Sequence, residues 1–381
     1  MSGPDWRAVV AVLGMLGMLA ATNPITAAAQ DQNAEQSPGP RAPLYPDHTK
    51  LLVVRDGEGH EHPVQNAGDW DVRRAHILAH FEEVAGKLPG GERRVPPDVR
   101  VIETRRAPRL VLTKITFASE PGDRVPAWIL VPDSTRPGAP KTRRPAVLCL
   151  HQTIPIGKDE PAGLGGNPDL HYAAELAHRG YVAIAPDYPG FGEYRIDVYK
   201  LGYASATMKA IWNNRRAVDV LVGRDDVDPD RIGAIGHSLG GHNAIFTALY
   251  EPRIRAVVSS CGFNAFPHYY HGNIAGWSHR GYMPRLREHY ALDLARVPFD
   301  FPELIGALAP RAFFTNSPLH DDNFDVAGVR AAIDAARPVY QLLGAGQERL
   351  VAVHPDARHS FPAEVRPRAY EFLDHNLRGE R

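Results

Sequence analysis

A serine set between two glycines is the residue in this sequence best placed to act as a nucleophile. The run RIGAIGHSLGGHNAIFTALY (231–250) reads as a short apolar strand, a sharp turn that carries Ser238, and then a helix. Gly236 and Gly240 supply the small residues that such a turn needs where backbone segments nearly touch. At a helix start, free N–H groups and the positive helix end stabilise a developing oxyanion. This context favours a nucleophile elbow over a glycine-rich turn with a capping serine.

A serine hydroxyl is a weak nucleophile, so it needs a base and a carboxylate that orients the base. In folds built around such an elbow, the chain order is serine, acid, histidine. Acids follow the expected strand at 311–317, in the run PLHDDNFD. We choose Asp321 as the acid, with Asp322 and Asp325 as alternatives. The aspartates not used for catalysis would cap a loop or a helix.

His359 is the expected base, because it lies in a loop just after the expected strand RLVAVHP (349–355). Open α/β sheets place their sites in such loops, beyond the carboxyl ends of the strands. His354 lies too close to its strand and precedes a proline, so we interpret it as structural. His237, inside the elbow, is expected to pack beside the nucleophile.

Two backbone N–H groups are expected to form the oxyanion hole. One belongs to Leu239, the residue after the nucleophile, and the other to the loop after the strand PAVLCL (145–150). In that loop we choose Gln152, with Thr153 as a close alternative.

The segment 263–300 lies between two core strands and is rich in aromatic residues and histidine. It is either a lid whose aromatic side chains form a partly polar pocket over the site or a helical excursion with a small core of its own. The pocket candidates are Tyr269, Tyr270, Trp277 and Tyr282. Three of its histidines, His268, His271 and His279, lack the carboxylate-rich spacing of a metal site, so no metal is expected.

Strands are expected to alternate with helices along most of the chain, which predicts an α/β fold with a mostly parallel twisted sheet and helices on both faces. The expected strands are 109–119, 125–132, 145–151, 181–190, 232–235, 256–262, 311–317 and 349–355. The expected helices are 69–89, 171–180, 208–224 and 366–377, and turns are expected at 120–123 and 228–230. The first two strands should form an antiparallel hairpin.

The N-terminus is typical of a secretory signal peptide. Arg7 precedes a short apolar run, and a small-residue site predicts cleavage after Ala29, with an uncleaved anchor as the alternative. The resulting organisation is a signal peptide (1–29), a Pro-rich flexible leader (30–47), an N-terminal extension (48–108) and a catalytic domain (109–381). Such a protein would be secreted or periplasmic, with no membrane span after cleavage.

Composition and charge limit the classes of partner that this protein is expected to bind. The formal net charge is −1 and there is no block of Lys or Arg, so nothing electrostatic favours nucleic acid. Cys149 and Cys261 are expected in different strands that are not neighbours, too far apart for a bridge, and hence as buried free thiols.

Taken together, five stretches resemble α/β-hydrolases of the clan that holds dienelactone hydrolases, acetyl xylan esterases and prolyl oligopeptidases, in the manner of a secreted bacterial esterase. They are LHQT (150–153), GYVAIAPDYPGFG (180–192), DPDRIGAIGHSLGG (228–241), LAPRAFF…DDNF (308–324) and HSFP (359–362). In that clan the acid begins a D-x-x-x-P stretch; Asp321 stands at its place, and Asp325 where proline is usual.

The resemblance implies ester or amide hydrolysis through an acyl-serine intermediate, without a cofactor. We expect a carboxylic ester hydrolase whose substrate is a small-molecule or carbohydrate ester. A peptidase of the prolyl oligopeptidase type is the alternative, although too few residues precede the sheet for a propeller. A catalytically silent binding protein on the same fold is the third hypothesis, and the complete Ser, Asp and His set argues against it.

Overall fold

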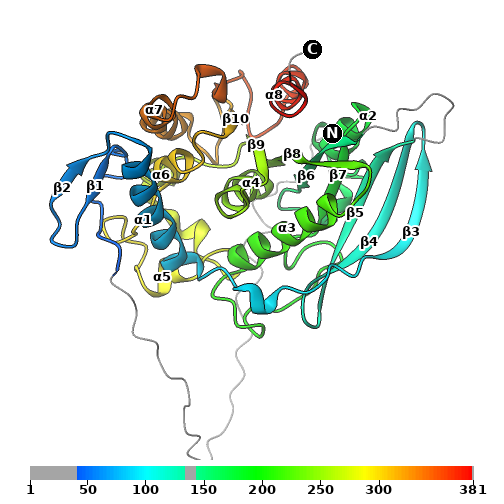
Figure 1. Ribbon diagram of the computed structural model, residues 1–381, viewed down its shortest axis with the longest axis horizontal. Helices are drawn as coiled ribbons and strands as arrows, with labels where there is room; N and C mark the ends of the chain where they lie inside the picture. Colours follow the sequence, from blue (N-terminus) through cyan, green and yellow to red (C-terminus); the bar gives the residue numbers. More distant parts are fainter. Residues whose placement is uncertain (1–40, 134–142, 380–381) are drawn as a thin grey trace, which may run out of the picture. The chain divides into compact units, whose positions relative to one another are not determined.

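A nine-stranded sheet organises the computed structural model, which describes residues 41–133 and 143–379 (Figure 1). From one edge to the other, its strands are β11 (Leu350–Val353), β10 (Ala312–Asn316), β9 (Ile254–Ser260), β8 (Val227–His237), β6 (Arg144–Leu150), β7 (Val182–Pro186), β5 (Asp123–Pro132), β4 (Leu110–Glu120) and β3 (Arg100–Ala107). The first six run parallel, and β5, β4 and β3 are each antiparallel to the strand before them. A separate antiparallel pair joins β1 (Val53–Arg55) to β2 (Glu61–Pro63).

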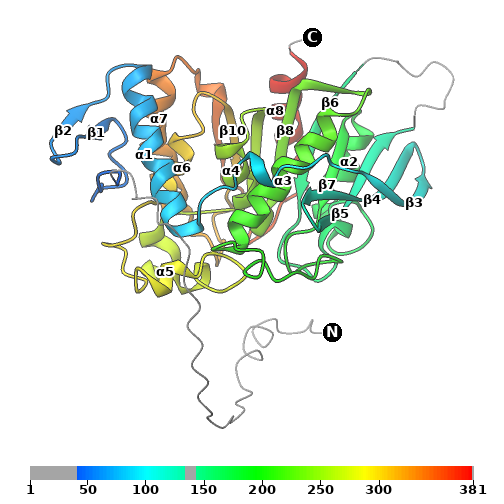
Figure 2. The same ribbon diagram turned by 60° about the horizontal axis from the view of Figure 1, so that its bottom comes forward.

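Helices cover both faces of the sheet, and each face has its own apolar core. One face carries α3 (Ala206–Val222), α4 (Leu239–Tyr250), α6 (Phe301–Gly306) and α7 (Val326–Leu342), with α1 (Ala67–Ala85) packed outside α4. The other face carries α2 (Tyr172–His178) and α8 (Arg366–Arg378), as the two views show (Figures 1 and 2). The short helix α5 (Arg285–Glu288) lies in the segment after β9.

The predicted α/β sheet is confirmed, and the apolar runs explain its centre. The five residues of β7 are all buried, as expected of a parallel strand covered on both faces. The predicted hairpin is the pair β4 and β5. One detail differs: the expected turn at 228–230 is the start of β8, because Val227 already pairs with Arg144. The turn lies at 223–226 instead.

The N-terminal extension belongs to the same folded unit as the sheet. Trp70, Ile77, Phe81 and Val84, which are spaced to share one face of α1, are all buried. A buried ion pair between Arg73 and Glu303 joins α1 to α6. The predicted domain boundary at 109 falls between β3 and β4, so the extension also supplies an edge strand, half of whose residues are charged, that the sequence did not reveal.

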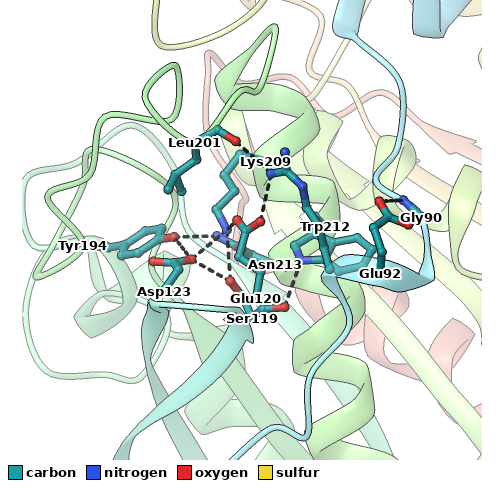
Figure 3. A network of polar contacts seen from close by, with 11 residues as sticks. Gly90, Glu92, Ser119, Glu120, Asp123, Tyr194, Leu201, Lys209, Trp212 and Asn213 are labelled. Atoms are coloured by element: carbon teal, nitrogen blue, oxygen red, sulfur yellow. Dashed lines mark hydrogen bonds and ion pairs between the residues drawn. The ribbon is translucent and has the colours of Figure 1, made fainter. Parts of the chain in front are cut away.

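A buried ionic cluster fixes the β4–β5 turn to α3 (Figure 3). The Lys209 ammonium lies 2.5 Å from Glu120 Oε1 and 2.7 Å from Asp123 Oδ2, and donates to the Ser119 hydroxyl at 3.0 Å. Tyr194, from the loop after β7, donates to the same Asp123 oxygen at 2.6 Å. Opposite charges and complete hydrogen bonding let these groups remain buried. The cluster therefore anchors the loop after β7.

The predicted signal peptide (1–29) and most of the predicted leader (30–47) lie outside the described residues. Within the described part of the chain, no helix combines the length and apolar character needed to cross a membrane.

Candidate active site

The elbow predicted around Ser238 has the expected geometry. Strand β8 ends at His237 and α4 begins at Leu239, so a single residue makes the whole turn. Ser238 has φ 52° and ψ −116°, a conformation that is costly for a residue with a side chain and is found mostly at functional sites. Its N–H donates to the Ser260 carbonyl at 2.8 Å, which ties the turn to β9.

The two glycines of the motif are required by close backbone contacts. A Cβ on Gly240 would lie 1.8 Å from the Leu150 carbonyl oxygen, at the end of β6. A Cβ on Gly236 would lie 2.2 Å from the carbonyl carbon of Gly240. Both contacts are with backbone atoms, whose displacement is energetically costly. The glycines therefore let α4 begin directly against β6 and β8, as the sequence indicated.

The structure brings Asp321 and His359 together. Asp321 follows β10 and His359 follows β11, and the His359 Nδ1–H donates to both carboxylate oxygens at 2.9 Å. The carboxylate also accepts the N–H groups of Asn323 at 2.8 Å and Phe324 at 3.0 Å. Burial raises the pKa of Asp321, but the hydrogen bonds from His359 and the two amides outweigh it and hold the pKa below its ordinary value. The Nδ1–H tautomer leaves Nε2 of His359 free to accept a proton.

The alternative acids and bases have other surroundings. Asp322 is 85% exposed and lies 3.8 Å from Arg358. Asp325 caps α7 by accepting the Ala327 N–H at 2.8 Å. His354 donates to the Ser317 carbonyl at 2.9 Å. Of these three residues, none contacts the elbow in the described hydrogen bonds.

His237 packs against the candidate base, with ring centroids 4.9 Å apart. Burial, and then the nearby His359, lower the pKa of His237 well below its ordinary value, so its ring is neutral. Its Nδ1 lies 2.9 Å from the Ser260 hydroxyl. These contacts agree with the role we expected for His237, which is to pack beside the nucleophile.

Sequence reasoning missed a hydrogen-bonded row of residues at the ends of three adjacent strands. His237, Ser260 and Asn316 end β8, β9 and β10 in register, and we name them the strand-end row. The Asn316 amide donates to the Ser260 hydroxyl and to the Ser360 carbonyl, both at 2.8 Å. The row thus links the elbow to the loop of His359. Its signal in the sequence is a polar residue closing each apolar strand.

The loop after β6, where we expected the second oxyanion N–H, is held by a buried histidine. His151 accepts the Tyr188 N–H at 2.9 Å and donates from Nδ1 to the Gln152 carbonyl at 2.6 Å. Burial lowers its pKa, which agrees with a neutral ring that both donates and accepts. The other expected donor, Leu239, is the first residue of α4, where N–H groups lack a helical acceptor.

The aromatic segment 263–300 contacts the site loops, and its four aromatic candidates form one run of ring contacts: Tyr270 with Tyr269, Tyr269 with Trp277, and Trp277 with Tyr282. Trp277 and Tyr269 are buried in a cluster with Phe324, which itself packs 6.0 Å from the His359 ring. Tyr282 reaches the Thr153 hydroxyl at 3.3 Å, and Tyr270 is exposed. The segment therefore has a small core of its own and also borders the site.

Both cysteines of the chain are free and buried, as predicted. Cys261 lies beside the acid and base: its Sγ, an Asp321 oxygen and a His359 nitrogen lie within 4.8 Å of one another. Three such atoms could ligate a metal. Here burial raises the pKa of the Cys261 thiol, which donates to the Ser360 carbonyl at 3.3 Å, and His359 Nδ1 is engaged by Asp321. These hydrogen bonds suit a protonated thiol rather than a ligand.

Comparison with known proteins points to esterases. The family model described as "Glucuronyl esterase, fungi" matches residues 191–344, which include Ser238 and Asp321. The Bacillus subtilis protein named "Putative hydrolase YtaP" is 27% identical over 316 residues, covering 79% of this chain and 98% of that protein.

Solved structures share the fold. A glucuronoyl esterase from Solibacter usitatus superposes with a TM-score of 0.66 at 18% identity, covering 88% of this chain and 99% of the other. The Bacteroides fragilis structure called a "putative acetyl xylan esterase" gives 0.56 at 20% identity, covering 75% of each chain.

The sheet and these matches define the fold: the chain has the α/β-hydrolase fold, as the sequence predicted. Within that fold its similarity is to carbohydrate esterases, and the predicted enzyme class, a carboxylic ester hydrolase, agrees with the family match and the hydrolase relative.

Proposed function

We propose that this protein is a secreted serine esterase that cleaves carboxylic esters of carbohydrates. The observation that carries the proposal is the pairing of His359 with the buried Asp321, in loops adjacent to the strained elbow of Ser238. A neutral imidazole oriented by a carboxylate is what a serine hydroxyl needs to become a nucleophile.

In the proposed reaction, Ser238 Oγ attacks the ester carbonyl while His359 Nε2 takes its proton. Asp321 keeps His359 in the required tautomer and stabilises the imidazolium. The Leu239 N–H and a second N–H, from Gln152 or Thr153, hold the oxyanion. His359 then protonates the leaving alcohol, and a water molecule activated by the same histidine hydrolyses the acyl-serine.

The substrate class rests on the names of similar proteins. Glucuronoyl esterase names an ester in which the sugar supplies the acyl group, and acetyl xylan esterase one in which the sugar supplies the alcohol. Both point to a carbohydrate ester, which suits a secreted enzyme. Secretion itself rests on the predicted signal peptide at 1–29.

Ser238→Ala tests the nucleophile in protein that begins at residue 30. The variant should remain folded, lose covalent labelling by a fluorophosphonate, and lose hydrolysis of p-nitrophenyl acetate, acetylated xylan and a glucuronate methyl ester. Persistent labelling of the variant would disprove the assignment. Cleavage of a proline-terminated peptide anilide by the wild type would favour a peptidase instead.

Asp321→Asn and Asp322→Asn form a matched pair that tests the acid. We expect the first to lower kcat by about ten-thousand-fold, because the amide favours the wrong histidine tautomer. The second should change kcat for p-nitrophenyl acetate by less than about threefold, since Asp322 is exposed. Equal effects in the two variants would show that Asp321 is not the orienting acid.

A further inference from the structure

A cleft of about 720 Å³ borders the candidate site on the side of its acid. Three loops line it: the segment after β9 with Tyr270 and His271, the loop after β10 with Asp321 and Asp322, and the loop after β11 with Asp356 and Arg358. These loops follow neighbouring strands at their carboxyl ends, the same edge of the sheet at which β8 presents Ser238. A ligand in the cleft would therefore lie next to the ester proposed to react.

Tyr270 gives the cleft an exposed aromatic face. It is 54% exposed and is the one aromatic among the large apolar side chains exposed in the described residues. Tyr269 supports it from the core, edge-on at a centroid distance of 4.9 Å. Both Tyr270 (φ 44°) and His271 (φ 57°) adopt the left-handed conformation, which disfavours residues with side chains. Backbone held in this way at a cleft is typical of a functional constraint.

The remaining lining is polar and acidic. Four carboxylates, those of Asp321, Asp322, Asp325 and Asp356, face one guanidinium, that of Arg358, together with three histidines. Asp322 and Asp356 are highly exposed, with side chains 85% and 86% accessible. Carboxylates accept hydrogen bonds from hydroxyl groups, and an imidazole can accept one or donate one, whereas an excess of negative charge repels an anionic ligand.

We infer that this cleft binds neutral sugar units of the substrate, with one ring stacked on Tyr270 and hydroxyls hydrogen-bonded to the acidic rim. An apolar face beside hydroxyl-binding groups matches a pyranose, which has C–H groups on its faces and hydroxyls on its edge. The inference rests on the proposed function and deepens it: the cleft selects the carbohydrate, and Ser238 cleaves the ester.

Tyr270→Ala is the decisive variant. We compare kcat/KM for acetylated xylo-oligosaccharides with kcat/KM for p-nitrophenyl acetate, which is too small to reach the cleft. The ratio should fall about tenfold through a higher KM, while Tyr270→Phe keeps the ring and should keep the ratio within about twofold. Leu44→Ala, which trims a side chain 59% exposed elsewhere, should leave the ratio unchanged. A ratio unaltered by Tyr270→Ala would overturn the inference.

Direct binding separates this inference from the proposed function. Calorimetry on the Ser238→Ala protein should detect xylohexaose, and adding Tyr270→Ala should weaken its binding about tenfold. A xylo-oligosaccharide that carries a glucuronate should bind more weakly than the neutral chain. Equal binding by the two proteins would reject the cleft even if the wild type hydrolyses esters. Binding lost in the double variant would support the cleft even if Ser238 proves not to be the nucleophile.

Discussion

Single residues decide how accurately the candidate base is held. Asn316 is the clearest case, because one buried amide donates to Ser260 and to the backbone of Ser360, the residue next to His359. Nothing else in the strand-end row reaches the His359 loop by a described side-chain hydrogen bond. Its effect on the reaction would be indirect, through the position of the histidine.

Asn316→Ala should therefore lower kcat by between about tenfold and a hundredfold with little change in KM, because small displacements of a catalytic group are costly. Fluorophosphonate labelling should slow in parallel, and the thermal midpoint should fall only modestly. Ser360→Ala is the matched control, since it leaves the backbone acceptor in place. A rise in KM with unchanged kcat would contradict a positioning role.

At the scale of helices and strands, backbone strain lies where two elements meet. The start of α4 lies against the end of β6 with no room for a side chain at Gly240. Gly240→Ala should destabilise the protein by about 3 kcal/mol or more and abolish labelling, because backbone on both sides must move. Gly344→Ala is the control: its φ is 71° but open space surrounds it, so the cost should be about 1 kcal/mol. Urea unfolding measures both.

The free energy of unfolding should depend on pH through Asp300, the N-cap residue of α6. Burial raises the pKa of Asp300 to about 7, although the Phe266 and Phe301 N–H groups bond its carboxylate. A carboxyl with a higher pKa in the folded than in the unfolded chain binds more protons when folded, so its contribution to stability falls as the pH rises from about 4 to about 7. His48, whose pKa is raised by Glu303 against the opposing effect of burial, adds a loss in the same direction as the pH rises through neutrality.

Asp300→Asn should therefore flatten the profile of unfolding free energy between pH 4.5 and 7.5, because the amide takes up no proton. Asp325→Asn, at the exposed cap of α7, serves as the control and should keep the slope of the wild type. Identical slopes for wild type and Asp300→Asn would show that Asp300 does not couple folding to protons.

The sequence predicted those elements whose pattern is local. The apolar runs of β6 to β11 and the elbow turn are each encoded by consecutive residues. The chain order of Ser238, Asp321 and His359 could also be predicted from the sequence. The strand-end row could not be read in this way, because it depends on which strands are neighbours and in what register. Strand β3 was missed for a different reason: its exposed, charged residues lack the alternation that indicates a strand.

At the scale of the whole molecule, the order of the strands determines whether the two cysteines can form a disulfide. Cys149 lies on β6 and Cys261 just after β9, with β8 between them, so both are free. Burial raises the pKa of each. The native protein should react negligibly with a thiol reagent and the urea-unfolded protein should titrate two thiols per chain, with a thermal midpoint unaffected by reductant. No thiol in the unfolded protein would indicate a disulfide and a different sheet.

The two ends of the sheet differ in how they prevent self-association. An unpaired strand offers its N–H and C=O groups to any other chain, which is a route to aggregation. At one end, β11 has only four residues and offers little to pair with. At the other, β3 has eight, nearly all exposed, and includes Arg100, Glu103, Arg105 and Arg106. Those charges make a second copy of the strand an unfavourable neighbour, so a long open edge can persist without pairing to another molecule.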